Sequence, residues 1–201
     1  MSTELFSDLQ SLMAGVDEVG RGCLFGPVVA AAVVFPVATI SKLQEMGIKD
    51  SKQLSALRRE TLAKDIKNTA ISYHICYASA QEIDRLNILN ASLLAMQRAV
   101  NKLSVTPQLC LVDGNKKIPN VIIPQETIIG GDRSSPFIAA ASILAKVWRD
   151  QLIVRLGAKY PQYDLANNKG YGTQKHLAAL QQYGPCFHHR RSFRPCQVIR
   201  E

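Results

Sequence analysis

Short apolar runs recur along the chain and are separated by more polar segments. Five runs have the length and apolar character of β-strands: residues 12–18, 27–35, 71–80, 108–114 and 120–129. The first two are joined by VGRGCLFG at residues 19–26, whose glycines permit tight backbone turns. This part of the chain is therefore predicted to be a strand-loop-strand unit.

Other segments carry apolar residues three or four positions apart, which is the spacing of one helix face. Helices are predicted at residues 55–68, 79–103, 135–160 and 173–184. Ser79 and Glu82 form a capping-box pattern, so the second helix is predicted to begin there and to run unbroken to residue 103. Gly184 is a suitable stop for the last helix.

The order of these elements indicates an α/β fold. Strands come first and then alternate with helices, which is typical of a mixed sheet with helices on its faces. No internal repeat, low-complexity tract or glycine-serine linker divides the chain, so we expect residues 1–201 to form a single domain. A chain of this length can bury a sizeable core without disulfides.

Composition excludes several classes of protein. The hydrophobic fraction is 47% and the aromatic fraction 6%, which argues against disorder and predicts a core of Val, Ile, Leu and Ala. Five cysteines without a CxxC pair indicate reduced, buried thiols and a cytoplasmic protein. The longest apolar stretch is too short to cross a bilayer, and the first ten residues lack a basic export signal, so neither a membrane span nor export is expected.

The net charge is +8, from 24 Lys and Arg against 16 Asp and Glu, which favours a polyanionic partner. A soluble basic protein without such a partner has the same balance, so charge alone does not identify the function. The chemistry therefore has to be inferred from individual side chains.

Four acidic residues stand at the ends of predicted segments. Asp17 and Glu18 end the first strand, Asp113 ends the fourth, and Asp132 precedes the helix at 135–160. In open sheets with parallel strands, side chains converge beyond the carboxyl ends of the strands. Neighbouring strand residues point to opposite faces, so Asp17 and Glu18 both reach such a site only if the strand bends, which the following glycines allow.

Several carboxylates close together repel one another, and a divalent cation is the natural neutraliser. An all-oxygen ligand set favours Mg²⁺ or Mn²⁺ over zinc. Taken singly, Asp113 before a glycine is typical of a turn, and Asp132 suits a helix start. Asp17 is harder to explain in this way, because apolar residues precede it and a second acid follows. Together the four acids indicate a metal site.

The segment CFHHRRSFR at residues 186–194 contains two adjacent histidines and one cysteine, which lack the paired spacing of a closed zinc site. We expect instead a basic surface with a buried aromatic anchor, formed by Arg190, Arg191, Arg194 and Phe193. His176 is expected on the surface of the last helix.

Six motifs resemble those of the bacterial ribonuclease HII family, in matching order from about residue 13 to residue 195: GVDEVGRGCLFGPVVAAAVVF, IKDSKQLS, LVDGN, GGDRSSPFIAAASILAKVWRD, KGYGT and HHRRSF. The related ribonuclease HIII family usually has a lysine where this chain has Arg21. The resemblance implies a ribonuclease H-like fold, a mixed five-stranded sheet flanked by helices. Its first three strands are antiparallel and the later ones parallel, and residues from about 160 to 201 form a helical C-terminal extension.

The resemblance also implies an activity. The enzyme would be an endonuclease that cleaves the RNA strand of RNA/DNA hybrids and single ribonucleotides embedded in duplex DNA, with a role in replication and repair. Two Mg²⁺ or Mn²⁺ ions would serve the hydrolysis, which leaves 5′-phosphate and 3′-hydroxyl ends. The implied catalytic metal ligands are Asp17, Glu18, Asp113 and Asp132. The protein is expected to be a monomer.

Substrate contacts follow from the same resemblance. Gly20, Arg21 and Gly22 correspond to a loop that contacts the ribonucleotide and its neighbouring phosphate. Tyr171 corresponds to a tyrosine that packs on the sugar at the RNA-to-DNA junction. Phosphate contacts are expected from Lys52, Lys146, Lys169 and Lys175. Lysines on a helix are as often exposed to solvent without any such contact, so for each of these four residues that alternative stays open.

The chain departs from the family pattern at Gln53, Asn168 and Gly172, where lysine, histidine and proline are frequent, and these changes bear on substrate affinity or loop rigidity. Two other functions stay open. A junction resolvase or sequence-independent DNase on the same fold would share the carboxylates but would not need the GRG and KGYGT motifs. A non-catalytic nucleic-acid-binding module would share the charge but would not need the acids.

Overall fold

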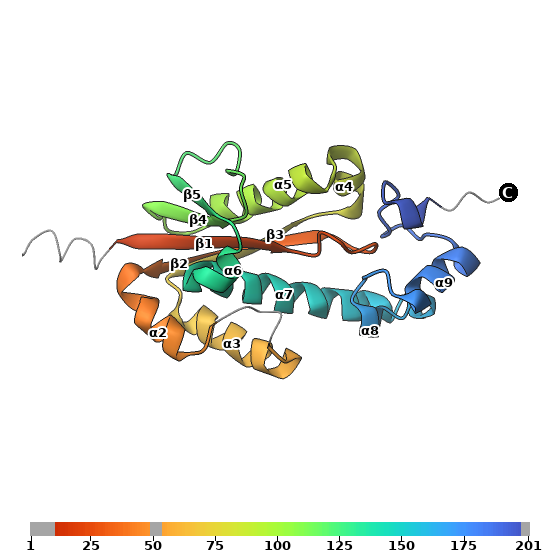
Figure 1. The fold of residues 1–201 in the computed structure, drawn as a ribbon, viewed down its shortest axis with the longest axis horizontal. Coiled ribbons are helices and arrows are strands. Elements are labelled where there is room, and N and C mark those ends of the chain that lie inside the picture. The colour runs from red at the N-terminus through yellow and green to blue at the C-terminus, as the bar shows by residue number, and fades with distance from the viewer. Residues whose placement is uncertain (1–10, 49–53, 198–201) are drawn as a thin grey trace, which may run out of the picture.

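The computed structural model describes residues 11–48 and 54–197. A five-stranded sheet lies between two layers of helices (Figure 1). Its strands are β1 (Leu12–Val19), β2 (Val28–Pro36), β3 (Ser72–Ala78), β4 (Leu109–Asp113) and β5 (Gln125–Ile128). They lie in the order β3-β2-β1-β4-β5. The pairs β1–β2 and β2–β3 are antiparallel, whereas β1–β4 and β4–β5 are parallel, which confirms the expected mixed α/β sheet.

Helices cover both faces of the sheet. The described helices are α2 (Ile40–Glu45), α3 (Ala56–Thr69), α4 (Ala80–Leu86), α5 (Ile88–Asn101), α6 (Gly131–Ser134), α7 (Pro136–Gly157), α8 (Leu165–Asn168) and α9 (Gln174–Tyr183), with short 3₁₀ turns η1 (Val37–Thr39), η2 (Pro161–Tyr163) and η3 (Arg194–Cys196). Figure 1 places α4 and α5 on one face and α2, α3 and α7 on the other. The C-terminal helices α8 and α9 lie beyond the end of β1.

The helix predicted at 79–103 is two helices. Ser79 and Glu82 form the expected capping box at the start of α4. The chain then turns at Asn87, where φ is 66° and ψ is 167°, and the Asn87 side chain accepts the N–H of Asn90 to cap α5. Asparagine tolerates positive φ and is a strong N-cap, so this polar residue ends one helix and begins the next.

The last predicted strand, 120–129, is shortened at its start to β5. Pro124 has no N–H to give to a ladder, so the segment before it does not pair as a strand. The Gln125 side chain instead holds this loop, because its amide oxygen accepts the N–H of Ile118 at 2.7 Å.

The apolar core lies on both faces of β1 and β2, whose side chains alternate between two clusters. Val29 belongs to the cluster under α3 and α7, and Ala30 to the cluster under α5. Gly15 lets α7 lie directly on β1, because a Cβ there would be 2.0 Å from the backbone oxygen of Phe137. This contact brings α7 beside the acidic end of β1.

The cysteines are free thiols, as predicted, with four of them buried and Cys186 partly buried. Across residues 11–48 and 54–197, no helix has the length and apolar character needed to span a membrane.

Candidate active site

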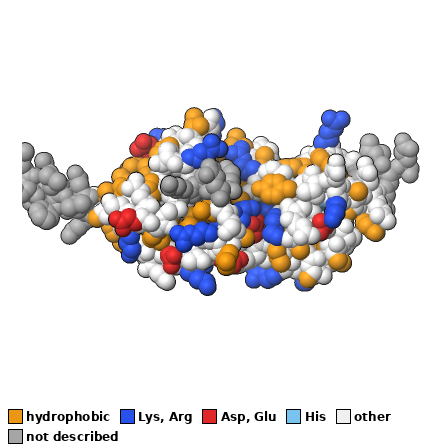
Figure 2. All heavy atoms as spheres, turned by 60° about the horizontal axis from the view of Figure 1, so that its bottom comes forward, with side chains coloured by type: hydrophobic (Ala, Val, Ile, Leu, Met, Phe, Trp, Pro, Cys, Tyr) orange, Lys and Arg blue, Asp and Glu red, His pale blue; other side chains and the backbone are white. Residues whose placement is uncertain are grey.

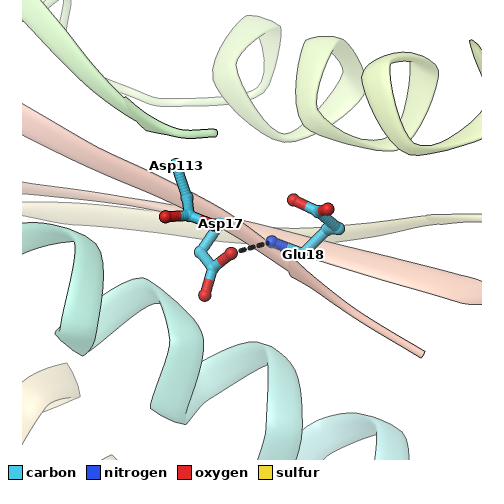
Figure 3. Close-up of side chains that lie close together, drawn as sticks. All are labelled: Asp17, Glu18 and Asp113. Atoms are coloured by element: carbon cyan, nitrogen blue, oxygen red, sulfur yellow. Dashed lines mark hydrogen bonds between the residues drawn. The ribbon is translucent and has the colours of Figure 1, made fainter. Parts of the chain in front are cut away.

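Three carboxylates meet at the carboxyl ends of β1 and β4. Asp17 and Glu18 lie near the end of β1, and Asp113 is the last residue of β4. One carboxylate oxygen from each lies within 4.8 Å of those from the other two. Figure 3 shows the Asp17 carboxylate turned toward α7 and the Glu18 carboxylate turned the other way. The structure therefore brings together acids that the sequence places on separate segments.

Adjacent acids reach one site without leaving the strand. The ladder between β1 and β2 stays in register through the pair Val19↔Val29, so neither acid is looped out. The parallel pairing of β1 with β4 ends earlier, at Val16↔Val112. Asp17 and Glu18 thus lie beyond the last pair with β4, where side chains from both faces of the sheet can approach its edge. Both acids therefore reach the site without the bend that was expected from the sequence.

Burial makes this cluster costly in its fully charged form. Asp17 is buried, and burial raises its pKa well above the usual range, with further contributions from the charges of Glu18 and Asp113. Burial also raises the pKa of Glu18, against the opposing effect of Arg21. A cation placed among the three carboxylates would therefore relieve both the desolvation and the mutual repulsion.

The donor set fits a hard divalent cation. Oε2 of Glu18 is buried and has no hydrogen-bond partner among the described residues, so a ligand position stands unused. The others are fixed: Asp113 Oδ1 accepts the N–H of Gly131 at 2.8 Å, and Asp17 Oδ1 accepts the N–H of Glu18 at 2.7 Å. Oxygen ligands held in this way suit Mg²⁺ or Mn²⁺.

Asp132 faces the same cavity from the single-turn helix α6 and is buried. It lies outside the group of three carboxylates that meet within 4.8 Å. The cavity has a volume of about 370 Å³, and its lining includes all four predicted acids together with Ser142 of α7. Ser142, which hydrogen-bonds to Asp17, was not identified from the sequence because a serine in an apolar helix carries no distinctive pattern.

The predicted GRG loop forms one wall of this cavity. Arg21 Nη1 lies 3.0 Å from Glu18 Oε1, and half of the Arg21 side chain remains exposed. Gly20 has a φ of +91°, and a Cβ there would be 2.2 Å from Nε of Arg149. Gly22, by contrast, has open space where a Cβ would stand. The loop therefore presents one charged side chain and an uncovered stretch of backbone.

Tyr171 and Lys146 also line this cavity. Tyr171 is exposed over 41% of its surface, and Nζ of Lys146 lies 5.8 Å from the centre of its ring. Lys146 also forms an ion pair with Asp150 at 2.9 Å. The Lys146 ammonium group thus lies close to the partly exposed ring of Tyr171, in the same cavity as the carboxylates.

The remaining predicted lysines lie away from this cavity or outside the described residues. Lys169 lines a neighbouring cavity between α3 and α7, and its ammonium group bonds to the carbonyl of Ala166. Lys175 is exposed at the start of α9. Lys52, like Gln53, lies outside the described residues.

The predicted basic surface at the C-terminal segment is wrong for Arg190, which is fully buried, although Arg191 and Arg194 are exposed. The Arg190 guanidinium donates to the backbone carbonyls of Gly20, Arg21 and Gly26. Backbone oxygens thus satisfy its donors, which is why the side chain can be buried.

A second buried guanidinium, that of Arg149, donates to the carbonyls of Phe25, Pro27 and Lys169. The one feature of the sequence that could have indicated this burial is the position of Arg149 within a mostly apolar predicted helix. The prediction for His176 is also wrong, since its side chain is fully buried and contacts the carbonyl of Tyr171.

Comparison with known proteins agrees with this geometry. A family model described as Ribonuclease HII matches residues 14–196. A ribonuclease HII from Acaryochloris marina is 60% identical over 191 residues, which cover 95% of this chain and 96% of that protein. One from Trichormus variabilis is 58% identical, with 96% of this chain and 86% of that protein covered.

Solved structures share the fold. The ribonuclease H2 from Pyrococcus horikoshii OT3 superposes with a TM-score of 0.80 at 28% identity, covering 92% of this chain and 95% of that one. The ribonuclease HII in a complex with PCNA from Archaeoglobus fulgidus gives a TM-score of 0.71 at 28% identity, covering 89% and 92% of the two chains. By the family match and these relatives, the chain belongs to the ribonuclease HII family and is a ribonuclease H endonuclease that acts on RNA/DNA.

Proposed function

We propose that this enzyme cleaves the RNA strand of RNA/DNA hybrids and also cuts at single ribonucleotides embedded in duplex DNA, leaving 5′-phosphate and 3′-hydroxyl ends. The observation that carries the proposal is the shared cavity, in which a cluster of carboxylates, the GRG loop and Tyr171 face one another. Such a cavity can hold a phosphate beside the acids while the adjacent sugar reaches the loop and the ring.

The carboxylates supply the catalytic centre in this proposal. Asp17, Glu18 and Asp113 hold divalent cations, and Asp132 contributes from the edge of the same cavity. Two bound Mg²⁺ or Mn²⁺ ions would lower the pKa of the attacking water and stabilise the leaving 3′-oxygen. The hydrogen bonds that fix Asp17 and Asp113 keep their oxygens in place before the substrate arrives.

The GRG loop and Tyr171 supply the choice of substrate. The 2′-hydroxyl distinguishes RNA from DNA at a given position. The backbone at Gly22 is uncovered, so its polar groups can approach that hydroxyl, while Arg21 places a charge near the phosphate. The exposed ring of Tyr171 packs on the sugar, and Lys146 beside it adds a second positive charge.

The basic excess serves to attract the duplex. Figure 2 shows Lys and Arg side chains spread over one face, with fewer acidic side chains between them. Charge distributed in this way favours contact with phosphates along a duplex without selecting a sequence. A cytoplasmic location and a monomeric enzyme belong to the same proposal, and Lys52 remains a proposed phosphate contact outside the described residues.

A DNA duplex with one embedded ribonucleotide tests the proposal. With Mg²⁺ or Mn²⁺ we expect cleavage on the 5′ side of that ribonucleotide alone, an uncut all-DNA duplex, and no turnover in EDTA. Asp113→Asn should lose most turnover, whereas Glu126→Gln, at an exposed residue of β5, should retain it. Equal cutting of the all-DNA duplex would indicate a general nuclease, and tight binding without cutting would indicate a binding module.

A further inference from the structure

Two buried histidines lie behind the Tyr171 loop, and the roles given above do not use them. His176 lies in the first turn of α9 and His189 in the loop before η3, and both are almost completely buried. Their Nε2 atoms are 3.0 Å apart. The other ring nitrogens contact backbone: Nδ1 of His189 is 3.0 Å from the N–H of Cys186, and Nδ1 of His176 is 2.8 Å from the carbonyl oxygen of Tyr171.

The backbone at both ends fixes the direction of this chain of hydrogen bonds. The Cys186 N–H can only donate, so Nδ1 of His189 accepts and its proton lies on Nε2. That Nε2–H donates to Nε2 of His176, which must therefore accept. His176 then carries its proton on Nδ1 and donates it to the Tyr171 carbonyl, which can only accept. The two rings are neutral and of opposite tautomers.

The surroundings are compatible with neutral rings. Burial lowers the pKa of His176, and burial together with the neighbouring His176 and His188 lowers that of His189 to about 3. A second proton on His176 would set two N–H groups against each other at the Nε2 contact, and a second proton on His189 would do the same at the Cys186 N–H. The directed chain therefore persists at neutral pH.

We propose that His176 and His189 are positioning residues that set the Tyr171 loop against the GRG loop. The inference rests on the proposed function, because it assumes that Tyr171 contacts the ribonucleotide. The histidines act through Tyr171, and they touch neither the substrate nor the carboxylates.

The loop that they hold has an unusual backbone conformation, which several hydrogen bonds fix. Lys169 and Gly170 before Tyr171 both have positive φ, of 51° and 87°. The Asn168 side chain accepts the N–H of Gly170 at 2.8 Å, and the Thr173 N–H donates to the same Tyr171 carbonyl as His176. A backbone that departs from preferred dihedrals keeps its shape only where its surroundings determine it. The histidine chain fixes the carbonyl of Tyr171 itself.

The same loop is tied to the GRG segment. The carbonyl of Gly170 accepts the N–H of Leu24 at 2.8 Å, and Phe25 pairs with His189 as an isolated β-bridge. The His189 ring also packs edge-on against Phe25 at 5.0 Å between ring centres. A shift of the histidine pair would therefore move the two substrate-reading loops relative to each other.

The first test is nitrogen NMR of the wild-type protein with labelled histidine at neutral pH. The inference requires a neutral His189 protonated on Nε2 and a neutral His176 protonated on Nδ1. The opposite tautomers, or a doubly protonated ring at either position, would overturn it. This measurement needs no variant and does not depend on whether a substitution disturbs folding.

The second test is a double-mutant cycle on the duplex with one ribonucleotide. His176→Phe keeps a ring of similar size but removes the hydrogen bond to Tyr171, and we expect kcat/KM to fall about tenfold, mainly through KM. In a Tyr171→Ala background the same change should alter kcat/KM by less than about twofold, because the group through which it acts is gone. The affinity for Mn²⁺ should stay within about twofold of wild type.

His188→Phe is the matched control. The His188 ring packs against Phe25 and Tyr160 but does not belong to the chain of hydrogen bonds, so this variant should cleave like wild type. Losses that add in the double variant would overturn the positioning role while leaving the role of Tyr171 intact. A fully active Tyr171→Ala would instead overturn the proposed role of Tyr171, and with it this use of the histidines.

Discussion

Replacing Asp17 by asparagine should stabilise the metal-free enzyme while removing its response to metal. The substitution keeps the side-chain shape and leaves an amide oxygen that can accept the N–H of Glu18, as Asp17 Oδ1 does now. It removes one of three negative charges that meet at the end of β1. The expected gain thus comes from relieved repulsion and desolvation, and little packing is lost.

The separation of the oxygens sets the size of the effect. One oxygen of Asp17 lies within 4.8 Å of one oxygen of Glu18 and one of Asp113. Two full charges at that distance repel by about 3 kcal/mol at an effective dielectric constant of about 20. Partial protonation relieves some of this repulsion in the wild type, so we expect the free energy of unfolding in EDTA at pH 7 to rise by about 1 to 3 kcal/mol.

The pH dependence provides a second signature. Burial, and after it the charges of Glu18 and Asp113, raises the pKa of Asp17 above its ordinary value of 3.8. The folded carboxyl therefore keeps its proton to a higher pH than the unfolded one. Its stabilising contribution is complete below about pH 4 and is lost as the pH rises through the folded-state pKa. The advantage of Asp17→Asn should accordingly widen between about pH 4 and pH 7.

Denaturant unfolding with and without Mn²⁺ measures both effects. Metal at a hundred times its Kd adds about 2.7 kcal/mol to the wild type and should add far less to Asp17→Asn, so the stability advantage of the variant should shrink by most of that amount. Glu126→Gln removes an exposed charge and should change neither value. An Asp17→Asn variant that is no more stable in EDTA, or that gains as much from Mn²⁺ as the wild type, would refute the reasoning.

Three further substitutions probe the loops around the carboxylates. Gly22→Ala should leave the free energy of unfolding within about 0.5 kcal/mol of wild type, because nothing lies within 4 Å of the added Cβ. The same variant should lower kcat/KM on the ribonucleotide-containing duplex. Unchanged kinetics would contradict a close approach of the substrate to Gly22. Gly20→Ala should cost more than about 2 kcal/mol in denaturant unfolding, since its Cβ would meet Nε of Arg149 at 2.2 Å and its φ is +91°. Arg190→Met should cost about 3 kcal/mol by leaving three carbonyls without their donor, and a loss below about 1 kcal/mol would show that water replaces the guanidinium.

Much of the fold follows from local patterns. The capping box at Ser79 and the cap at Thr173 depend on residues only three apart, and both form where the sequence places them. The break at Asn87 escaped the same reasoning, because apolar residues continue at helical spacing on both sides of it. The apolar spacing is the same whether a helix continues or restarts, so the periodicity alone does not reveal the break.

Some features of the candidate site also follow from the sequence, and others do not. Asp17, Glu18 and Asp113 stand at strand ends, and the parallel pairing of β1 with β4 is enough to bring them together. The geometry around Glu18 depends on where that pairing stops, which no pattern in the sequence marks. Ser142 reaches Asp17 only because α7 lies close on β1 at Gly15, a contact made by residues far apart in the chain.

The wrong surface predictions share one physical cause. Arginine is usually exposed and histidine is often at least partly exposed, yet Arg190 and His176 are both completely buried. The GRG loop and the Tyr171 loop are irregular, so their carbonyls lack the partners that a helix or sheet would provide, and buried carbonyls require donors. The carbonyls of Gly20 and Arg21 obtain theirs from Arg190, and that of Tyr171 from His176. Irregular loops at the rim of a cavity thus need polar side chains behind them. Such residues look like surface residues in the sequence because their partners are backbone atoms, which leave no pattern there.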